Sequence, residues 1–203
     1  MDVVFPDKLP LKDLIQISAW SVASVGGVIA AFRAVAEMRR GRTVAARDLR
    51  FTKAEQGKKL VDELLSDKAA SDALKMIDWS GLDFEIDKDR VETVTGDDVA
   101  TALRPDYGPF TNKERFIRDC FDALFERCER FEHFVRIGLT DFEDISRPID
   151  YYVNRMSRVD RVYNAYFDEF GYSLMPEFLN RFNAWKERAK TPPPTAPDAE
   201  RKA

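Results

Sequence analysis

The sequence contains few of the residues that enzymes most often use for metal binding and nucleophilic catalysis. Its 203 residues include two cysteines and one histidine, His133. A zinc site needs three or four ligands, and the sequence offers no second histidine and no metal-spaced cysteine pair. Phosphate-binding loops, dinucleotide-binding glycines and nucleophile elbows are also missing from the sequence. We therefore expect no metal and no cofactor.

The two cysteines are placed too far apart to form a disulfide. Cys120 and Cys128 fall in one expected helix, and eight residues correspond to about 12 Å along a helix axis. A disulfide requires Cα atoms within about 7 Å of each other. We expect both to be small buried thiols in a reducing compartment.

Charge is missing from one long stretch, although one-third of the chain is charged. No charged residue occurs from Leu14 to Phe32, and such a helix would be about 28 Å long, close to the roughly 30 Å hydrocarbon core of a bilayer. The sequence thus predicts a short non-cytoplasmic N-terminus over 1–13 and a transmembrane helix over 14–36. Two alternatives are a buried helix of a soluble domain, disfavoured by Gly26 and Gly27, and a cleaved signal peptide, disfavoured by the acidic leader.

Small residues recur at every fourth position of this segment, at Ala19, Ala23, Gly27 and Ala31. Stripes of small residues let helix backbones approach closely in lipid. We therefore expect helix–helix packing along this stripe, and with it homo-oligomerisation through the anchor helix. The alternative is that the stripe only reflects the alanine and glycine content of membrane helices.

A basic segment follows directly, and we expect it to be a juxtamembrane helix over 37–65. The positive-inside rule then predicts a single-pass protein of the inner (cytoplasmic) membrane, with the N-terminus outside and the C-terminal domain in the cytoplasm. The basic residues either only set this topology or also contact anionic headgroups of the lipid bilayer. Nucleic acid is not an expected partner, because Phe51 is the one aromatic residue interleaved with them. The expected membrane-surface residues are Arg39, Arg40, Arg42, Arg47 and Arg50.

The remaining sequence predicts an all-α cytoplasmic domain, a small helical bundle over 66–189, followed by a disordered tail over 190–203. A helix capped by Ser66 should end near Trp79. Alternation of apolar and polar residues predicts one short β-hairpin at about 82–95. Thr95 should cap the short helix after it.

The best helical pattern starts at a capping box, Thr111 to Glu114, and should end at Gly138. Pro148 suits the first turn of a longer helix that continues to about Phe170, and Pro176 suits the first turn of the last helix.

Arg127 and His133 lie six positions apart in the strongest helix. This spacing resembles the Arg–His motif of the all-helical HEPN ribonucleases, and the resemblance implies a composite RNA-cutting site at a dimer interface. Cys128 departs from the motif, because a polar residue usually follows the arginine. The alternative is a structural histidine in a protein without catalytic residues.

Three longer segments carry a second resemblance: DALKMIDW at 72–79, the stretch 116–139 and FEDISRPIDYYV at 142–153. Together they resemble a group of bacterial single-pass membrane proteins with a basic helix and an α-helical cytoplasmic domain. That group has no assigned activity, so the resemblance implies a layout and no chemistry.

These observations favour a membrane-anchored binding or regulatory module whose cytoplasmic domain engages a protein partner. The alternatives are a HEPN-like ribonuclease or toxin-type effector, and an effector that perturbs the membrane through oligomerisation of its anchor.

Overall fold

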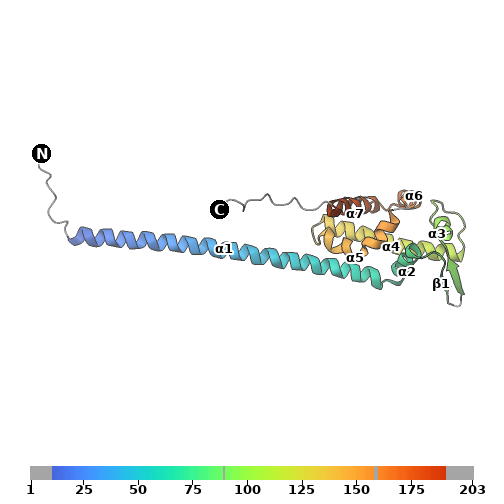
Figure 1. Cartoon of the computed structure of the whole chain (residues 1–203), viewed down its shortest axis with the longest axis horizontal. Helices are drawn as coiled ribbons and strands as arrows, with labels where there is room; N and C mark the ends of the chain where they lie inside the picture. Colours follow the sequence, from blue (N-terminus) through green and yellow to red (C-terminus); the bar gives the residue numbers. More distant parts are fainter. Residues whose placement is uncertain (1–10, 89, 158–159, 191–203) are drawn as a thin grey trace, which may run out of the picture. The chain divides into compact units, whose positions relative to one another are not determined.

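The structure is a computed structural model that describes residues 11–88, 90–157 and 160–190, with side chains from Arg33 onward except at 160 and 161. The chain divides into two units, Met1–Phe51 and Thr52–Ala203. The described residues form seven helices and one hairpin (Figure 1). They are, in chain order, α1 (Leu11–Ser66), α2 (Lys68–Asp78), β1 (Leu82–Asp87), β2 (Arg90–Val94), α3 (Gly96–Ala102), α4 (Asn112–Arg136), α5 (Phe142–Met156), α6 (Asp160–Phe170) and α7 (Met175–Lys190).

The expected transmembrane helix is contradicted. No helix in the described part of the chain is both long enough and apolar enough to cross a bilayer. The segment 14–36 is the beginning of the 56-residue α1, and charged side chains are frequent along α1 from Arg33 onward. Within the segment itself, polar residues and glycines interrupt the apolar ones at Gln16, Ser18, Ser21, Ser24, Gly26 and Gly27. The predictions of a single-pass topology and of an inner-membrane location are therefore wrong.

Helix α4 is the centre of the core in the 52–190 domain. It packs against α2, α3, α7 and β1. Its buried face repeats at three- and four-residue steps, as the sequence predicted, and includes Phe121, Leu124, Phe125, Cys128 and Phe131. Cys120 and Cys128 are buried free thiols. Burial raises the pKa of each to about 12, so both stay protonated at neutral pH.

Several local predictions are confirmed. Thr111 and Glu114 form the expected capping box at the start of α4, and Thr95 forms a second one with Asp98 at the start of α3. Gly138 has a φ of 74° and follows the C-cap residue of α4. The hairpin is antiparallel and pairs Leu82 with Val94.

Three local predictions are wrong. Asp67, rather than Ser66, caps α2, because its carboxylate accepts hydrogen bonds from two backbone N–H groups of the first turn. Pro148 lies inside α5 and not in its first turn. The helix starts earlier, at Phe142, and its first turn is acidic. The long helix expected up to Phe170 is two helices, α5 and α6.

Gly57 allows α1 and the start of α5 to approach closely. A Cβ at this position would lie 2.7 Å from Thr140 Oγ1 and 2.8 Å from Asp144 Cβ. The Thr140 hydroxyl donates a hydrogen bond of 3.0 Å to the carbonyl of Lys53, one turn earlier in α1. Gly57 has a low helix propensity, but the close packing of α1 against the start of α5 requires a residue without a Cβ.

We predict that Gly57→Ala lowers the free energy of unfolding by roughly 1–3 kcal/mol, because the added methyl group displaces the start of α5. The matched control is Gly41→Ala in the same helix, where no atom lies within 4 Å of the added Cβ. The control should not destabilise the protein, since alanine favours helix by about 1 kcal/mol over glycine. Urea unfolding followed by circular dichroism measures both, and equal effects would contradict the packing role.

Candidate functional site

A pocket of about 350 Å³ lies among α2, α3, α5, α6 and Ser80, which is two residues before β1. This volume falls at the lower end of the range of about 300–1,000 Å³ found for ligand pockets. The apolar part of its lining comes from Met76, Ile77, Val99, Ala100 and Val162. The polar lining residues are Ser80, Arg155 and Tyr163.

Arg155 is held in place by α2 and by its own helix. Its Nη1 lies 3.4 Å from Asp78 Oδ1 and 3.1 Å from the hydroxyl of Tyr151, which also donates a hydrogen bond to Asp78. The guanidinium carbon lies 5.8 Å from the centre of the Tyr151 ring. Within the described part of the chain, Nε and Nη2 of Arg155 have no hydrogen-bond partner. Arg155 is one of the residues that line the pocket.

Tyr163 provides a second donor on the pocket wall. The residue is 5% exposed, and its ring packs against Phe121 and Phe125 at centroid distances of 6.0 and 5.9 Å. Among the described residues the structure shows no hydrogen-bond partner for its hydroxyl. Burial raises the pKa of Tyr163 to about 12, so the hydroxyl is a hydrogen-bond donor at neutral pH.

The chemistry of this lining suits binding better than acid–base catalysis. The pocket has an apolar wall, one guanidinium and two hydroxyls, and its described lining contains no carboxylate, thiol or imidazole. Acid–base or nucleophilic mechanisms usually need one of those three groups in contact with the substrate.

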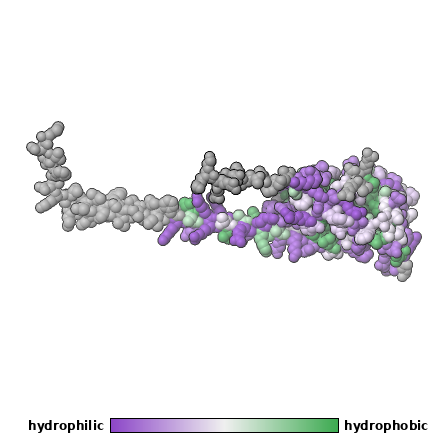
Figure 2. All heavy atoms as spheres, viewed as in Figure 1, coloured by the Kyte–Doolittle hydropathy of each residue, from purple (hydrophilic) through white to green (hydrophobic). Residues whose placement is uncertain are grey.

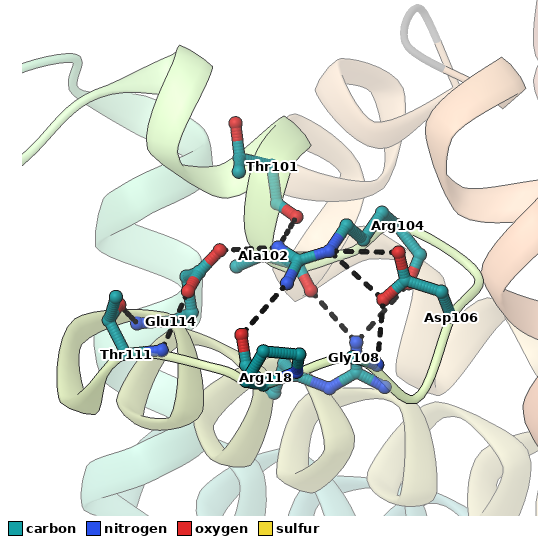
Figure 3. A network of polar contacts seen from close by, with 9 residues as sticks. Thr101, Ala102, Arg104, Asp106, Gly108, Thr111, Glu114 and Arg118 are labelled. Carbon is teal, nitrogen blue, oxygen red and sulfur yellow. Dashed lines mark hydrogen bonds and ion pairs between the residues drawn. The ribbon is translucent and has the colours of Figure 1, made fainter.

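The α3 wall of the pocket is fixed by a network around Arg104 (Figure 3). Arg104 donates hydrogen bonds to Asp106 at 3.0 Å, to the carbonyl of Thr101 at 2.9 Å, and to Glu114 at the start of α4. Glu114 in turn accepts a hydrogen bond of 2.7 Å from the backbone N–H of Thr111. The loop between α3 and α4 is thereby tied to both helices.

Arg118 completes this network from α4 and lies against aromatic rings. It donates to the carbonyl of Ala102 at 2.9 Å (Figure 3). Its guanidinium carbon lies 4.2 Å from the ring centre of Phe110, 4.6 Å from that of Phe170 and 4.9 Å from that of Tyr166. Cation–π contacts of this kind contribute about 0.5–2 kcal/mol each, so we assign Arg118 a structural role.

A buried carboxylate, Glu132, is also accounted for structurally. Its side chain is fully buried. Arg181 of α7 binds it through two nitrogens at 2.7 and 2.9 Å, and Arg136 donates at 3.2 Å. The hydrogen bond to Glu132 raises the pKa of Arg181. This bidentate ion pair connects α4 to α7 and leaves the Glu132 carboxylate with little capacity to bind a ligand.

The structure does not bring Arg127 and His133 into a shared site. Arg127 lies 2.9 Å from Asp67 and 3.5 Å from Glu63, so it connects α4 to α1 and α2. This ion pair is the largest cause of the lowered pKa of Asp67. His133 is exposed, with its ring centre 6.1 Å from that of Phe134. A ribonuclease remains a prediction that rests on the sequence spacing alone.

The predicted surface and packing residues of α1 lie in the first unit. The five arginines Arg39, Arg40, Arg42, Arg47 and Arg50 all have exposed side chains. Figure 2 shows hydrophilic and hydrophobic residues interspersed along the described part of α1. The predicted small-residue stripe, Ala19, Ala23, Gly27 and Ala31, lies outside the residues whose side chains the structure describes.

Among the described residues there is no group of three or more histidine, cysteine, aspartate or glutamate side chains arranged to hold a metal ion. Comparison of the chain with protein-family models, with curated proteins and with solved structures gave no match.

Sequence reasoning did not find the pocket and did not single out Arg155 as a binding residue. The partner of Arg155, Asp78, is 77 residues away in the sequence. Tyr163 lies on an apolar stripe that predicts only core packing. No local pattern could have joined these residues, because the pocket forms only when α2, α3, α5 and α6 meet.

We predict that the capping contacts of Glu114 contribute to acid sensitivity. The backbone N–H of Thr111 and the guanidinium of Arg104 lower the pKa of Glu114 from 4.5 to about 2. Because the folded-state pKa is the lower one, the contribution to stability is complete above about pH 4.5 and is lost as the pH falls toward 2. The free energy of unfolding should therefore depend less on pH in Glu114→Gln than in the wild type over this window. Glu126→Gln on the exposed side of α4 is the control, and an unchanged slope in Glu114→Gln would refute the assignment.

We predict that Arg127→Met and His133→Ala differ in their effect on folding. The first removes ion pairs to Glu63 and Asp67 and should lower the free energy of unfolding by roughly 1–2 kcal/mol. The second changes an exposed side chain and should stay within about 0.5 kcal/mol of the wild type. Thermal unfolding by calorimetry measures both, and a larger loss for His133→Ala would overturn the structural reading of this helix.

Proposed function

We propose that the protein is a binding and assembly module that pairs with a second copy of itself through residues 33–51 of α1. The pairing presents two copies of the 52–190 domain together to a protein partner. The observation that supports this is the exposure of a whole helical segment. Every side chain from 33 to 51 is exposed, and these include Val35, Met38 and Leu49, which are 49%, 65% and 59% exposed.

An exposed helix of this length gains little stability by itself. Isolated helices shorter than about 12–15 residues are marginal in water, and longer ones usually depend on packing of an apolar face. Side chains such as Met38 and Leu49 expose apolar surface that a second helix would cover. The segment therefore has a physical reason to pair.

The sequence of this segment has the spacing of a coiled coil. Val35, Met38, Arg42, Ala45 and Leu49 fall at successive a and d positions of a heptad repeat. Single polar residues at a positions, such as Arg42 here, commonly set the register of coiled coils. In the sequence, the same spacing places Val28 and Ala31 at the preceding a and d positions, whereas the positions before them are Ser21 and Ser24.

The basic residues are distributed so that two copies can approach. Arg33, Arg40 and Arg47 are seven residues apart and occupy f positions, opposite the a/d stripe. The positions that flank the stripe include small residues, Ala34, Gly41 and Ala46. Much of the positive charge would therefore face solvent when two such helices pair. A symmetric pair of this kind closes on itself and needs no third copy.

We predict that the full-length protein sediments as a dimer and that Val35→Glu with Leu49→Glu converts it to a monomer. The reason is that two carboxylates per chain would be placed in the apolar seam. The matched control is Val44→Glu with Phe51→Glu, which changes two exposed apolar residues that lie off the stripe. Sedimentation velocity at several protein concentrations distinguishes the two variants.

A disulfide test provides an independent readout. Ala45→Cys lies in the proposed seam and should form an intermolecular disulfide under mild oxidation, whereas Val44→Cys should do so much less. The native thiols do not compete, because both are buried. A monomeric wild type at every concentration, or dissociation of the off-stripe control, would contradict the proposal.

A further inference from the structure

The pocket beside Arg155 has features that its role as part of the core does not require. It is a depression of about 350 Å³ that is open to solvent, and its lining includes the exposed residues Ser80 and Ala100. Tyr163 lies in its wall and is 5% exposed. Its hydroxyl has no hydrogen-bond partner among the described residues. This hydroxyl can donate a hydrogen bond to water or to a ligand in the pocket.

The orientation of the Arg155 guanidinium indicates which ligand chemistry the pocket favours. Asp78 and Tyr151 both contact Nη1 of Arg155, at 3.4 and 3.1 Å, and so fix the side chain from one side. The other edge, formed by Nε and Nη2, presents two parallel N–H donors. This fork matches the two oxygens of a carboxylate, and such paired hydrogen bonds are stronger than neutral ones.

The charge of Asp78 is compatible with an anionic ligand. Asp78 contacts the opposite end of the guanidinium and is not part of the pocket lining. It partly neutralises Arg155 when the pocket is empty, so the protein does not hold an unpaired cation beside an apolar wall. A ligand carboxylate would then face the guanidinium edge and the hydroxyl.

We propose that this pocket binds a small carboxylic acid with an apolar body. Its carboxylate accepts hydrogen bonds from the guanidinium of Arg155 and the hydroxyl of Tyr163. Its hydrocarbon part lies against Met76, Val99 and Val162. This binding site is independent of the pairing proposed for α1, because all of its lining residues lie in the 52–190 domain.

The test uses the full-length protein and octanoate as the probe, with octan-1-ol as the neutral control. Isothermal titration calorimetry should show octanoate binding to the wild type at least about tenfold more tightly than octan-1-ol, since charge-assisted hydrogen bonds contribute about 1.5–3 kcal/mol. Arg155→Met should weaken octanoate binding at least about tenfold, and Tyr163→Phe by about three- to tenfold. Arg147→Met, an exposed arginine of the same helix, should bind as the wild type does.

Two further variants separate binding from folding. Arg155→Lys keeps the charge but lacks the planar fork, so it should also weaken octanoate binding. Ala100→Trp alters an exposed residue of the pocket wall and should block the probe without affecting the core. Equal affinity for octanoate and octan-1-ol, wild-type affinity in Arg155→Met, or no binding of octanoate to the wild type would each overturn the proposal.

Discussion

The packing of the aromatic face of α4 is the interaction on which the rest of the 52–190 domain depends. The ring of Phe125 lies within 6.0 Å of the ring centres of Tyr163, Tyr166, Phe167 and Tyr172. Burial of a phenylalanine contributes about 1.5–3 kcal/mol, and aromatic pairs add to this. The hydroxyls of two of these tyrosines are held by one carboxylate of α4 at 2.7 Å. Helix α6 and the turn after it are therefore placed by α4, and with them one wall of the pocket.

The ion pairs of this domain mostly link helices that α4 already brings together. Arg181 and Glu132 connect α7 to α4, while Arg127 connects α4 to Glu63 at the end of α1. Such pairs add geometric specificity more than net stability, because desolvation offsets much of their attraction. Arg155 differs from them, since one edge of its guanidinium has no partner among the described residues. That difference distinguishes a candidate binding residue from the structural arginines.

The sequence predicted the parts of this structure that local rules control. The cap at Thr95, the capping box at Thr111, the hairpin after Gly81 and the stop at Gly138 each depend on neighbours within a few residues. Two predictions failed where neighbouring residues give competing signals. Ser66 and Asp67 can both cap α2, and the helical pattern over α5 and α6 does not show where one helix ends and the next begins. The pocket depends on contacts across more than 70 residues, as between Asp78 and Tyr151. The uncharged segment shows a further limit, because low charge alone does not make a helix apolar enough to cross a membrane.

The 52–190 domain is stabilised by its own core, whereas in the proposed dimer residues 33–51 of α1 gain protection by pairing with a second copy. Hydrogen–deuterium exchange at two protein concentrations tests both halves directly. Amides of α4 should exchange slowly at either concentration, because their protection depends on folding alone. Amides of 33–51 should exchange faster in the dilute sample, where the dimer dissociates. Exchange in 33–51 that does not change with concentration would contradict the account.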